Sequence, residues 1–153
     1  MDALKMTVAE RRQLTEHICE FTLAPADGSK LQSFTAGAHI TVETPSGAMR
    51  RYSLVNDGTN PEVYKIALKR EIHGRGGSMS MHDDAQEGTE LQVEVPENTF
   101  ELTDAKNYLL IAGGIGVTPI YAMSQQLLRE FKPFEVIYCT RGEADTAFLE
   151  EMK

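Results

Sequence analysis

The chain of 153 residues contains only two cysteines, Cys19 and Cys139. Two thiols cannot hold an iron–sulfur cluster or a structural zinc ion without further ligands. No other Cys, His or carboxylate residues stand at the spacing of a metal site, so we predict that the chain binds no metal. Both cysteines lie in apolar, strand-like runs, and we expect each to be a buried free thiol.

Long apolar segments are also missing from the sequence. No run approaches the ~20 apolar residues that a helix needs to cross a bilayer, and residues 1–6 lack the apolar core of a signal peptide. The net charge of −8 disfavours nucleic acid and anionic membranes as partners. We therefore expect a globular cytoplasmic protein that has no nucleic-acid partner and no membrane partner.

Against this acidic background, positive charge gathers between residues 50 and 75. That window holds six Lys or Arg residues and three acids, so its charge is 6 − 3 = +3 in a chain of net charge −8. Glycines and hydroxyl residues accompany these cations. A positive segment of this kind predicts a site for a small anionic ligand rather than a solvated charged face.

The first two thirds of the chain have the pattern of an antiparallel β-structure. Apolar and polar residues alternate in short runs that are separated by polar turns. Such runs predict a closed antiparallel barrel or a sandwich. The expected strands are residues 4–13, 18–23, 39–43, 49–54, 63–70 and 91–95, with a short helix at 77–83.

After residue 105 the pattern changes to that of an α/β domain. A continuous apolar run at 108–112 precedes a glycine loop, a helical segment at 119–131 and a second strand at 134–139. This order is the start of a parallel sheet, and a further helix is expected over 145–153.

These patterns divide the chain into two domains, 1–104 and 105–153. Two strands and one helix cannot cover both faces of a parallel sheet. We therefore expect the second domain to be incomplete and the chain to be part of a longer protein.

The glycine loop Gly114-x-Gly116-x-x-Pro119 lies between an expected strand and an expected helix. Glycines let a backbone approach a pyrophosphate, and a helix N-terminus attracts it. Thr118 suits the N-cap and Pro119 the first turn. The third glycine of the dinucleotide fingerprint is missing, and no acid follows the strand at 134–139. Taken alone, the loop is either a pyrophosphate site or a tight strand-to-helix turn.

Two further motifs are individually weak. In Arg50-Arg51-Tyr52-Ser53, a strand places Arg50 and Tyr52 on one face and Arg51 and Ser53 on the other. Alone, this tetrapeptide is typical of an exposed edge strand. Arg75-Gly76-Gly77-Ser78 offers a cation, a hydroxyl and free N–H groups, which suit either an anion nest or a flexible loop.

In combination, these motifs resemble the ferredoxin–NADP reductase superfamily, whose strand motif is Arg-x-Tyr-Ser/Thr and whose nucleotide motif is Gly-Gly-x-Gly-x-Thr-Pro. Within it, the chain is most similar to the phthalate dioxygenase reductase and vanillate demethylase reductase group. The resemblance runs from end to end of the chain. The segments that carry it are 50–57, 67–70, 74–80, 96–100 and 110–119.

The resemblance implies an antiparallel six-stranded Greek-key barrel that binds flavin, followed by the first β-α-β of a sheet that binds NADH or NADPH. By that likeness, Arg50 and Arg75 would grip the flavin phosphate, with Arg51 also among the cofactor-binding residues. Gly76, Gly77 and Ser78 would bind the phosphate through N–H and hydroxyl groups.

The same resemblance assigns the remaining site residues. Tyr52 would lie against the flavin, with Ala67 and Lys69 beside its ring or ribityl chain. The predicted catalytic residues are Ser53, near the reactive ring nitrogen, and Thr118, where flavin and nicotinamide meet. The residues that approach the nucleotide pyrophosphate are Gly114 and Gly116.

The implied function is that of a flavin-dependent NAD(P)H oxidoreductase, an enzyme that passes electrons to an iron–sulfur centre and then to an oxygenase. FMN is expected rather than FAD, because Arg75 precedes the paired glycines. A 2Fe-2S cluster is expected only in a C-terminal domain beyond this chain. The family's Cys-Gly-Pro segment and its cluster-binding cysteines are absent from these residues. The alternatives are a non-catalytic flavoprotein electron-transfer subunit and a cofactor-less barrel that serves as an interaction module.

Overall fold

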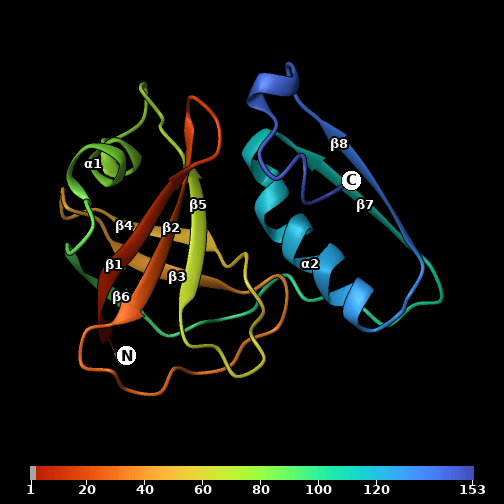
Figure 1. The fold of residues 1–153 in the computed structure, drawn as a ribbon, viewed down its shortest axis with the longest axis horizontal. Coiled ribbons are helices and arrows are strands. Elements are labelled where there is room, and N and C mark those ends of the chain that lie inside the picture. Colours follow the sequence, from red (N-terminus) through yellow and green to blue (C-terminus); the bar gives the residue numbers. More distant parts are fainter. Residues whose placement is uncertain (1–2) are drawn as a thin grey trace.

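The computed structural model describes residues 3–153, which form a β-barrel with a smaller α/β unit beside it (Figure 1). The barrel contains β1 (Ala3–Gln13), β2 (Ile18–Pro25), β3 (His39–Glu43), β4 (Met49–Ser53), β5 (Tyr64–Lys69), α1 (Gly77–Asp84) and β6 (Glu90–Glu94). The α/β unit contains β7 (Tyr108–Gly113), η1 (Gly114–Gly116), α2 (Val117–Arg129), β8 (Phe134–Cys139) and η2 (Glu143–Asp145). None of the helices in residues 3–153 is long and apolar enough to cross a membrane.

The six barrel strands follow the order β4-β3-β6-β1-β2-β5, and each strand pairs antiparallel to its neighbours. An isolated bridge between Leu54 and Ile66 joins the end of β4 to β5, which closes the sheet. Strands that are neighbours in space are not always neighbours in sequence, as in a Greek key. The expected six-stranded antiparallel barrel is confirmed.

The wall of the barrel that faces the α/β unit is buried on both sides. Along β2, Phe21 and Leu23 point into the barrel core, whereas Ile18 belongs to a second apolar cluster. Ala67 of β5 joins that second cluster together with Val117 of α2. The second core therefore contains side chains of both units, and its burial holds α2 against the barrel.

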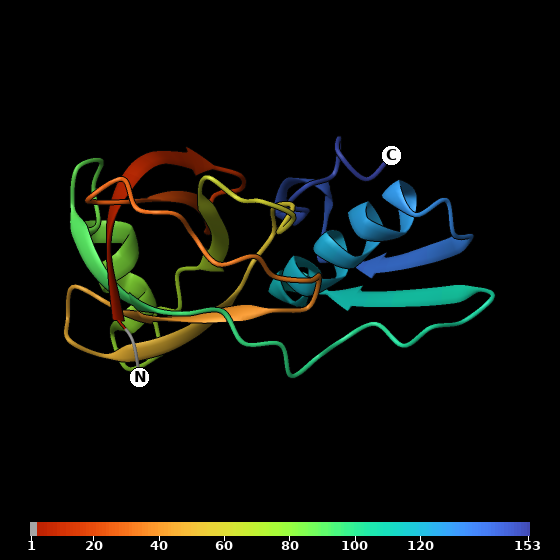
Figure 2. The same ribbon diagram turned by 90° about the horizontal axis from the view of Figure 1, so that it is seen from below.

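Polar contacts fix the same arrangement. The segment after β6 runs along one side of the molecule to β7 (Figure 2). Its Asn98 side chain donates to Thr35 Oγ1 at 2.7 Å and to the Ala36 carbonyl at 3.1 Å. The N–H of Ala36 donates in turn to Gln126 Oε1 of α2 at 3.0 Å. One loop of the barrel is thus tied both to the linker and to α2.

In the α/β unit, β7 and β8 pair in parallel, and α2 lies between them and the barrel (Figure 1). Leu110 and Ala112 of β7 are buried in the second core. Leu109 and Ile111 point to the opposite face and are 57% and 62% exposed. The expected start of a parallel sheet is confirmed, with one apolar face uncovered.

Two expectations about this part of the chain are wrong. The α-helix expected over 145–153 is absent, and the residues after η2 form turns, because Phe148 has a positive φ of 62° and stacks on Tyr121 with ring centroids 4.3 Å apart. Cys19 is a buried free thiol, as expected, but Cys139 is exposed. Cys139 lies on the face of β8 that turns away from the second core.

Candidate functional site

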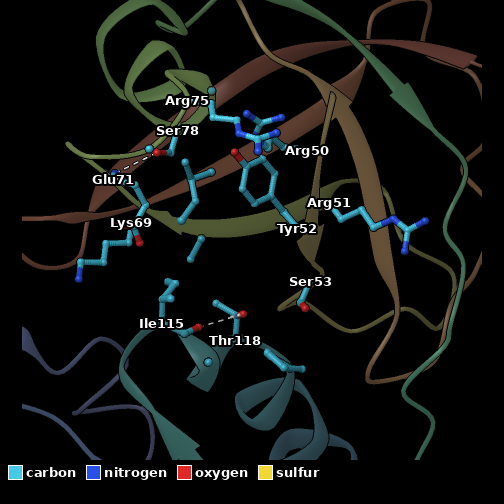
Figure 3. Close-up of a pocket in the computed structure, with 16 residues that line it drawn as sticks. Arg50, Arg51, Tyr52, Ser53, Lys69, Glu71, Arg75, Ser78, Ile115 and Thr118 are labelled. Carbon is cyan, nitrogen blue, oxygen red and sulfur yellow. Dashed lines mark hydrogen bonds between the residues drawn. The ribbon is translucent and has the colours of Figure 1, made fainter. Parts of the chain in front are cut away.

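A cavity of about 470 Å³ lies between the barrel and the first turn of α2. Its walls come from β4, β5, the loop before α1 and the η1–α2 junction (Figure 3). We call it the first cavity. Figure 3 shows Arg50, Arg75 and Ser78 at one end and Ile115 and Thr118 at the other. The cavity thus has a cationic end on the barrel and an opposite end on the α/β unit.

Two arginines at the cationic end have no carboxylate partners. Arg50 extends from β4 and Arg75 from the loop before α1, and both lie beside the hydroxyl of Tyr52 (Figure 3). Within residues 3–153, neither guanidinium forms an ion pair, whereas the nearby Arg70 pairs with Asp83 at 3.1 Å. Uncompensated arginines in a cavity attract an anion and can bind it in a bidentate way.

The start of α1 completes this end. Gly76 precedes the helix with φ of 90°, a conformation that favours glycine. A Cβ atom on Gly77 would lie 2.9 Å from Arg50 Nε, so the missing side chain makes room for the guanidinium. Ser78 Oγ accepts the Glu71 N–H at 2.9 Å, which leaves the hydroxyl proton free to donate. Free N–H groups, a hydroxyl and two cations are the donor set of a phosphate site.

Tyr52 connects the cationic end to the middle of the cavity. Its hydroxyl is buried and has no hydrogen-bond partner within the described residues. Burial raises the pKa of Tyr52 to about 12, although Arg50 acts in the opposite direction. The phenol therefore keeps its proton at neutral pH and can donate it. A buried hydroxyl without a partner is rare in folded proteins, and it suits a ligand that supplies an acceptor.

A histidine of α1 hydrogen-bonds to β5, the strand that forms one wall of the cavity. His82 of α1 is buried, and its Nε2 lies 2.9 Å from the Leu68 carbonyl. Because a carbonyl only accepts, Nε2 carries the proton in this contact. Desolvation lowers the pKa of His82 and favours this neutral form. The imidazole thereby fixes α1 relative to the strand that carries Ala67 and Lys69.

Thr118 lies at the far end of the cavity, but it is not the N-cap. The helix begins at Val117, Gly116 occupies the cap position, and no side chain caps the helix. The Thr118 hydroxyl donates to the Ile115 carbonyl at 3.3 Å inside the first turn. The predicted cap is therefore wrong because the preceding η1 turn starts the helix earlier. Pro119 lies in the first turn, as expected.

Most of the predicted site residues line this one cavity, and two do not. Gly76 supports the loop without lining the cavity, and Gly114 lines a neighbouring one. Arg51 lines the cavity, but its side chain is exposed and points away from Tyr52 (Figure 3). The residues that come together as predicted are Arg50, Arg51, Tyr52, Ser53, Ala67, Lys69, Arg75, Gly77, Ser78, Gly116 and Thr118.

The second cavity, of about 530 Å³, lies at the carboxyl ends of β7 and β8. Lys69 and Ile115 line both cavities, so the two adjoin there. Sequence reasoning did not assign most residues of the second cavity to a site. Thr140 and Arg141 could have been found, because ligands of parallel sheets bind beyond the strand ends. No local signal marks the barrel residues Thr15, His17 and Ile18.

Comparison with known proteins supports a relationship along the whole chain. Residues 110–153 match the family described as the oxidoreductase NAD-binding domain. The chain is 44% identical over 149 residues to the phthalate 4,5-dioxygenase oxygenase reductase subunit of Pseudomonas putida. It is 42% identical over 147 residues to the vanillate O-demethylase oxidoreductase of the same species. These alignments cover 96% and 95% of the chain and 46% of each relative.

A solved structure gives the same result. It is described as phthalate dioxygenase reductase, a modular structure for electron transfer from pyridine nucleotides to 2Fe-2S. It matches with a TM-score of 0.95 at 41% identity, over 98% of this chain and 47% of that one. The chain spans about half the length of the curated relatives it matches. Over almost its whole length the chain is homologous to phthalate dioxygenase reductase and vanillate O-demethylase oxidoreductase, the group that its sequence motifs predicted.

Proposed function

We propose that the chain is the flavin- and nucleotide-binding part of an NAD(P)H-dependent oxidoreductase. Residues 1–104 hold FMN in the first cavity, and residues 105–153 supply part of the site for NADH or NADPH. When bound, the flavin provides hydride acceptance and single-electron transfer. The observation that carries the proposal is the buried Tyr52 hydroxyl, which has no partner within residues 3–153 and lies beside two arginines that form no ion pair with those residues.

The residues at the cationic end fit a phosphate monoester. Arg50 and Arg75 offset its charge, Ser78 donates its hydroxyl proton, and Gly77, the first residue of α1, lines the same cavity. Gly77 keeps Arg50 close to the helix start. Tyr52 donates to the phosphate or to the polar chain that joins the phosphate to the ring. Each group has a donor available, and the cofactor would give the Tyr52 hydroxyl the partner that the described residues do not supply.

The middle and far end fit a flat heterocycle. Ala67, Leu68 and Ile115 provide apolar walls that exclude water from the ring. Ser53 places a hydroxyl at the end of β4, where it can hydrogen-bond to a ring nitrogen. Thr118 and Gly116 form the side from which the nicotinamide approaches. These residues bind and orient the reactants. Among them, we propose that Ser53 and Thr118 contact the reacting atoms.

FMN is favoured over FAD by the position of Arg75. Its guanidinium lies beside Arg50 at the cationic end (Figure 3), where the phosphate of FAD would continue into an adenosine. The terminal phosphate of FMN can bind both arginines. FAD would in addition need space beyond Arg75 for its adenosine.

The wider role follows from the relatives. They are named as reductase components of phthalate dioxygenase and vanillate demethylase systems. We propose that the protein likewise passes electrons from NAD(P)H through the flavin to a 2Fe-2S domain and then to an oxygenase component. The cations at the rim, including Arg51, would favour an acidic electron acceptor.

The first test measures flavin affinity in matched variants. The purified chain is stripped of flavin and titrated with FMN, with flavin fluorescence as the signal. Arg50→Ala should weaken FMN binding more than tenfold, because charge-assisted hydrogen bonds contribute about 1.5–3 kcal/mol each. Arg51→Ala, one residue along the same strand, should change the dissociation constant by less than about threefold, because exposed charges contribute little. Equal effects, or no FMN binding at all, would refute the proposal.

The second test follows reduction under anaerobic conditions. Dithionite should bleach the visible band of the bound flavin quickly. NADH or NADPH should bleach it more slowly, because the family's Cys-Gly-Pro segment beside the nicotinamide is absent from these residues. Bleaching by dithionite with none by either nucleotide would favour the alternative of an electron-transfer subunit that a partner reduces.

A further inference from the structure

The turn between β1 and β2 belongs to the barrel, yet it forms a wall of the second cavity. Thr15, His17 and Ile18 line this cavity together with Thr140 and Arg141, which follow β8. The two groups are more than 120 residues apart in sequence. The cavity at the carboxyl ends of β7 and β8 therefore has a wall that the α/β unit does not supply.

Thr15 gives this wall a buried hydroxyl donor. The residue is only 9% exposed, and its Oγ1 accepts the N–H of His17 at 3.2 Å and of Ile18 at 3.1 Å. Because both of these contacts use lone pairs, the hydroxyl proton is free to donate to an acceptor in the cavity.

The turn is rigid without any contribution from the His17 imidazole. The Gln13 amide donates to the Thr15 carbonyl at 2.8 Å, and the His17 carbonyl accepts the Arg70 N–H at 2.8 Å. The His17 side chain is 44% exposed, and its nearest carboxylate, Glu16, lies 3.9 Å away. The imidazole is therefore positioned by the backbone and available to a ligand.

Groups that can donate to an anion predominate around the second cavity. Lys69, Arg141 and the His17 imidazole line it, and Asp145 is the single acid among its lining residues in the part of the chain described. Lys69 extends away from Arg50 and Arg75 (Figure 3). An extended ligand with its ring in the first cavity would pass Lys69 and Ile115 and bring its phosphates into this region.

We propose, on the basis of the nucleotide-dependent function above, that the barrel contributes directly to nucleotide binding. The His17 imidazole and the Thr15 hydroxyl bind the phosphate-bearing adenosine half of NADH or NADPH. The nucleotide then contacts the β1–β2 turn on one side and the ends of β7 and β8 on the other, so its binding links the two units.

The test uses the whole FMN-loaded chain and ADP-ribose, which carries the adenosine and both phosphates but no nicotinamide. Calorimetric titration compares wild type, His17→Ala and the control Glu16→Ala, whose side chain is 85% exposed on the same turn and does not line the cavity. His17→Ala should raise the dissociation constant roughly three- to tenfold, as loss of a hydrogen bond does. Glu16→Ala should not raise it. FMN affinity should be unchanged in both variants.

A second pair of variants separates the hydroxyl from the shape of the turn. Thr15→Ser keeps the hydroxyl and should bind ADP-ribose as wild type does, whereas Thr15→Val should bind it more weakly. Wild-type affinity in His17→Ala, or an equal loss in Glu16→Ala, would overturn the inference while leaving the proposed function intact. A wild-type chain that binds FMN but not ADP-ribose would overturn the inference and the proposed nucleotide site together.

Discussion

Replacing Tyr52 by phenylalanine should have opposite effects on the flavin-free and the flavin-bound protein. Without flavin, the Tyr52 hydroxyl is buried with no hydrogen-bond partner among residues 3–153. A buried polar group without a hydrogen-bond partner lowers the free energy of unfolding by about 1–3 kcal/mol. Removing it should stabilise the flavin-free chain by about 1 kcal/mol, which raises the melting temperature by roughly 2–4 °C for a chain of this size.

With FMN bound, we propose that the same hydroxyl donates to the phosphate or the ribityl chain. Loss of a hydrogen bond to a charged acceptor costs about 1.5–3 kcal/mol, which is roughly a ten- to hundredfold rise in the dissociation constant. Tyr52→Phe should therefore melt higher than wild type without flavin and gain less stability when FMN is added. Thermal melts with and without FMN, together with an FMN titration, measure both effects.

Tyr64→Phe is the matched control. The Tyr64 hydroxyl donates to the Gln32 carbonyl at 2.7 Å, so its removal breaks a satisfied hydrogen bond in the barrel. This variant should melt lower than wild type in both states and bind FMN with unchanged affinity. A Tyr52→Phe chain that behaves in the same way as Tyr64→Phe would refute the assignment of the Tyr52 hydroxyl to the ligand.

Other positions give further expected outcomes. Arg75→Ala should weaken FMN binding more than tenfold and riboflavin binding by less than about twofold, since only FMN has the phosphate; equal losses in the two titrations would exclude a phosphate contact. Gly77→Ala should also weaken the binding of FMN more than that of riboflavin, because the new Cβ atom would lie 2.9 Å from Arg50 Nε and displace the guanidinium. Phe131 follows the C-cap residue of α2, has φ of 57° and is 94% exposed, so Phe131→Gly should raise the free energy of unfolding by about 1 kcal/mol, whereas Phe131→Ala should not; denaturant titration measures both. The chain should associate through the uncovered face of β7, and Ile111→Lys should reduce that association in light scattering; a wild-type chain that stays monomeric at high concentration would contradict this expectation.

The barrel was predictable because its signal is local. Alternating side chains along β1 and β6 reflect one buried face on each strand, so sequence alone places them within a few residues. The turns at 145–153 were not predictable, because the stacking of Phe148 on Tyr121 decides that segment. This contact joins residues 27 positions apart, and no local pattern reports it.

The candidate site, too, was predictable from the sequence only in part. Arg50, Tyr52, Arg75 and Ser78 were expected to meet because of the family resemblance, and the structure places all four around one cavity. Their physical state was not readable from the sequence. Within the part of the chain that the structure describes, Arg50 and Arg75 form no ion pairs and the Tyr52 hydroxyl is buried, and both features depend on long-range packing. The second cavity was missed in part for the same reason, since its barrel wall comes from a turn with no binding motif.

We propose that the first cavity binds FMN through its phosphate. Competition among flavins tests this directly: the flavin-free chain is reconstituted with an equimolar mixture of FMN, FAD and riboflavin, unbound flavin is removed, and the bound flavin is released by heat and separated by chromatography. We expect one dominant FMN peak at close to one equivalent per chain. A dominant FAD peak, equal retention of riboflavin or a chain that retains no flavin would show that the phosphate does not select the ligand.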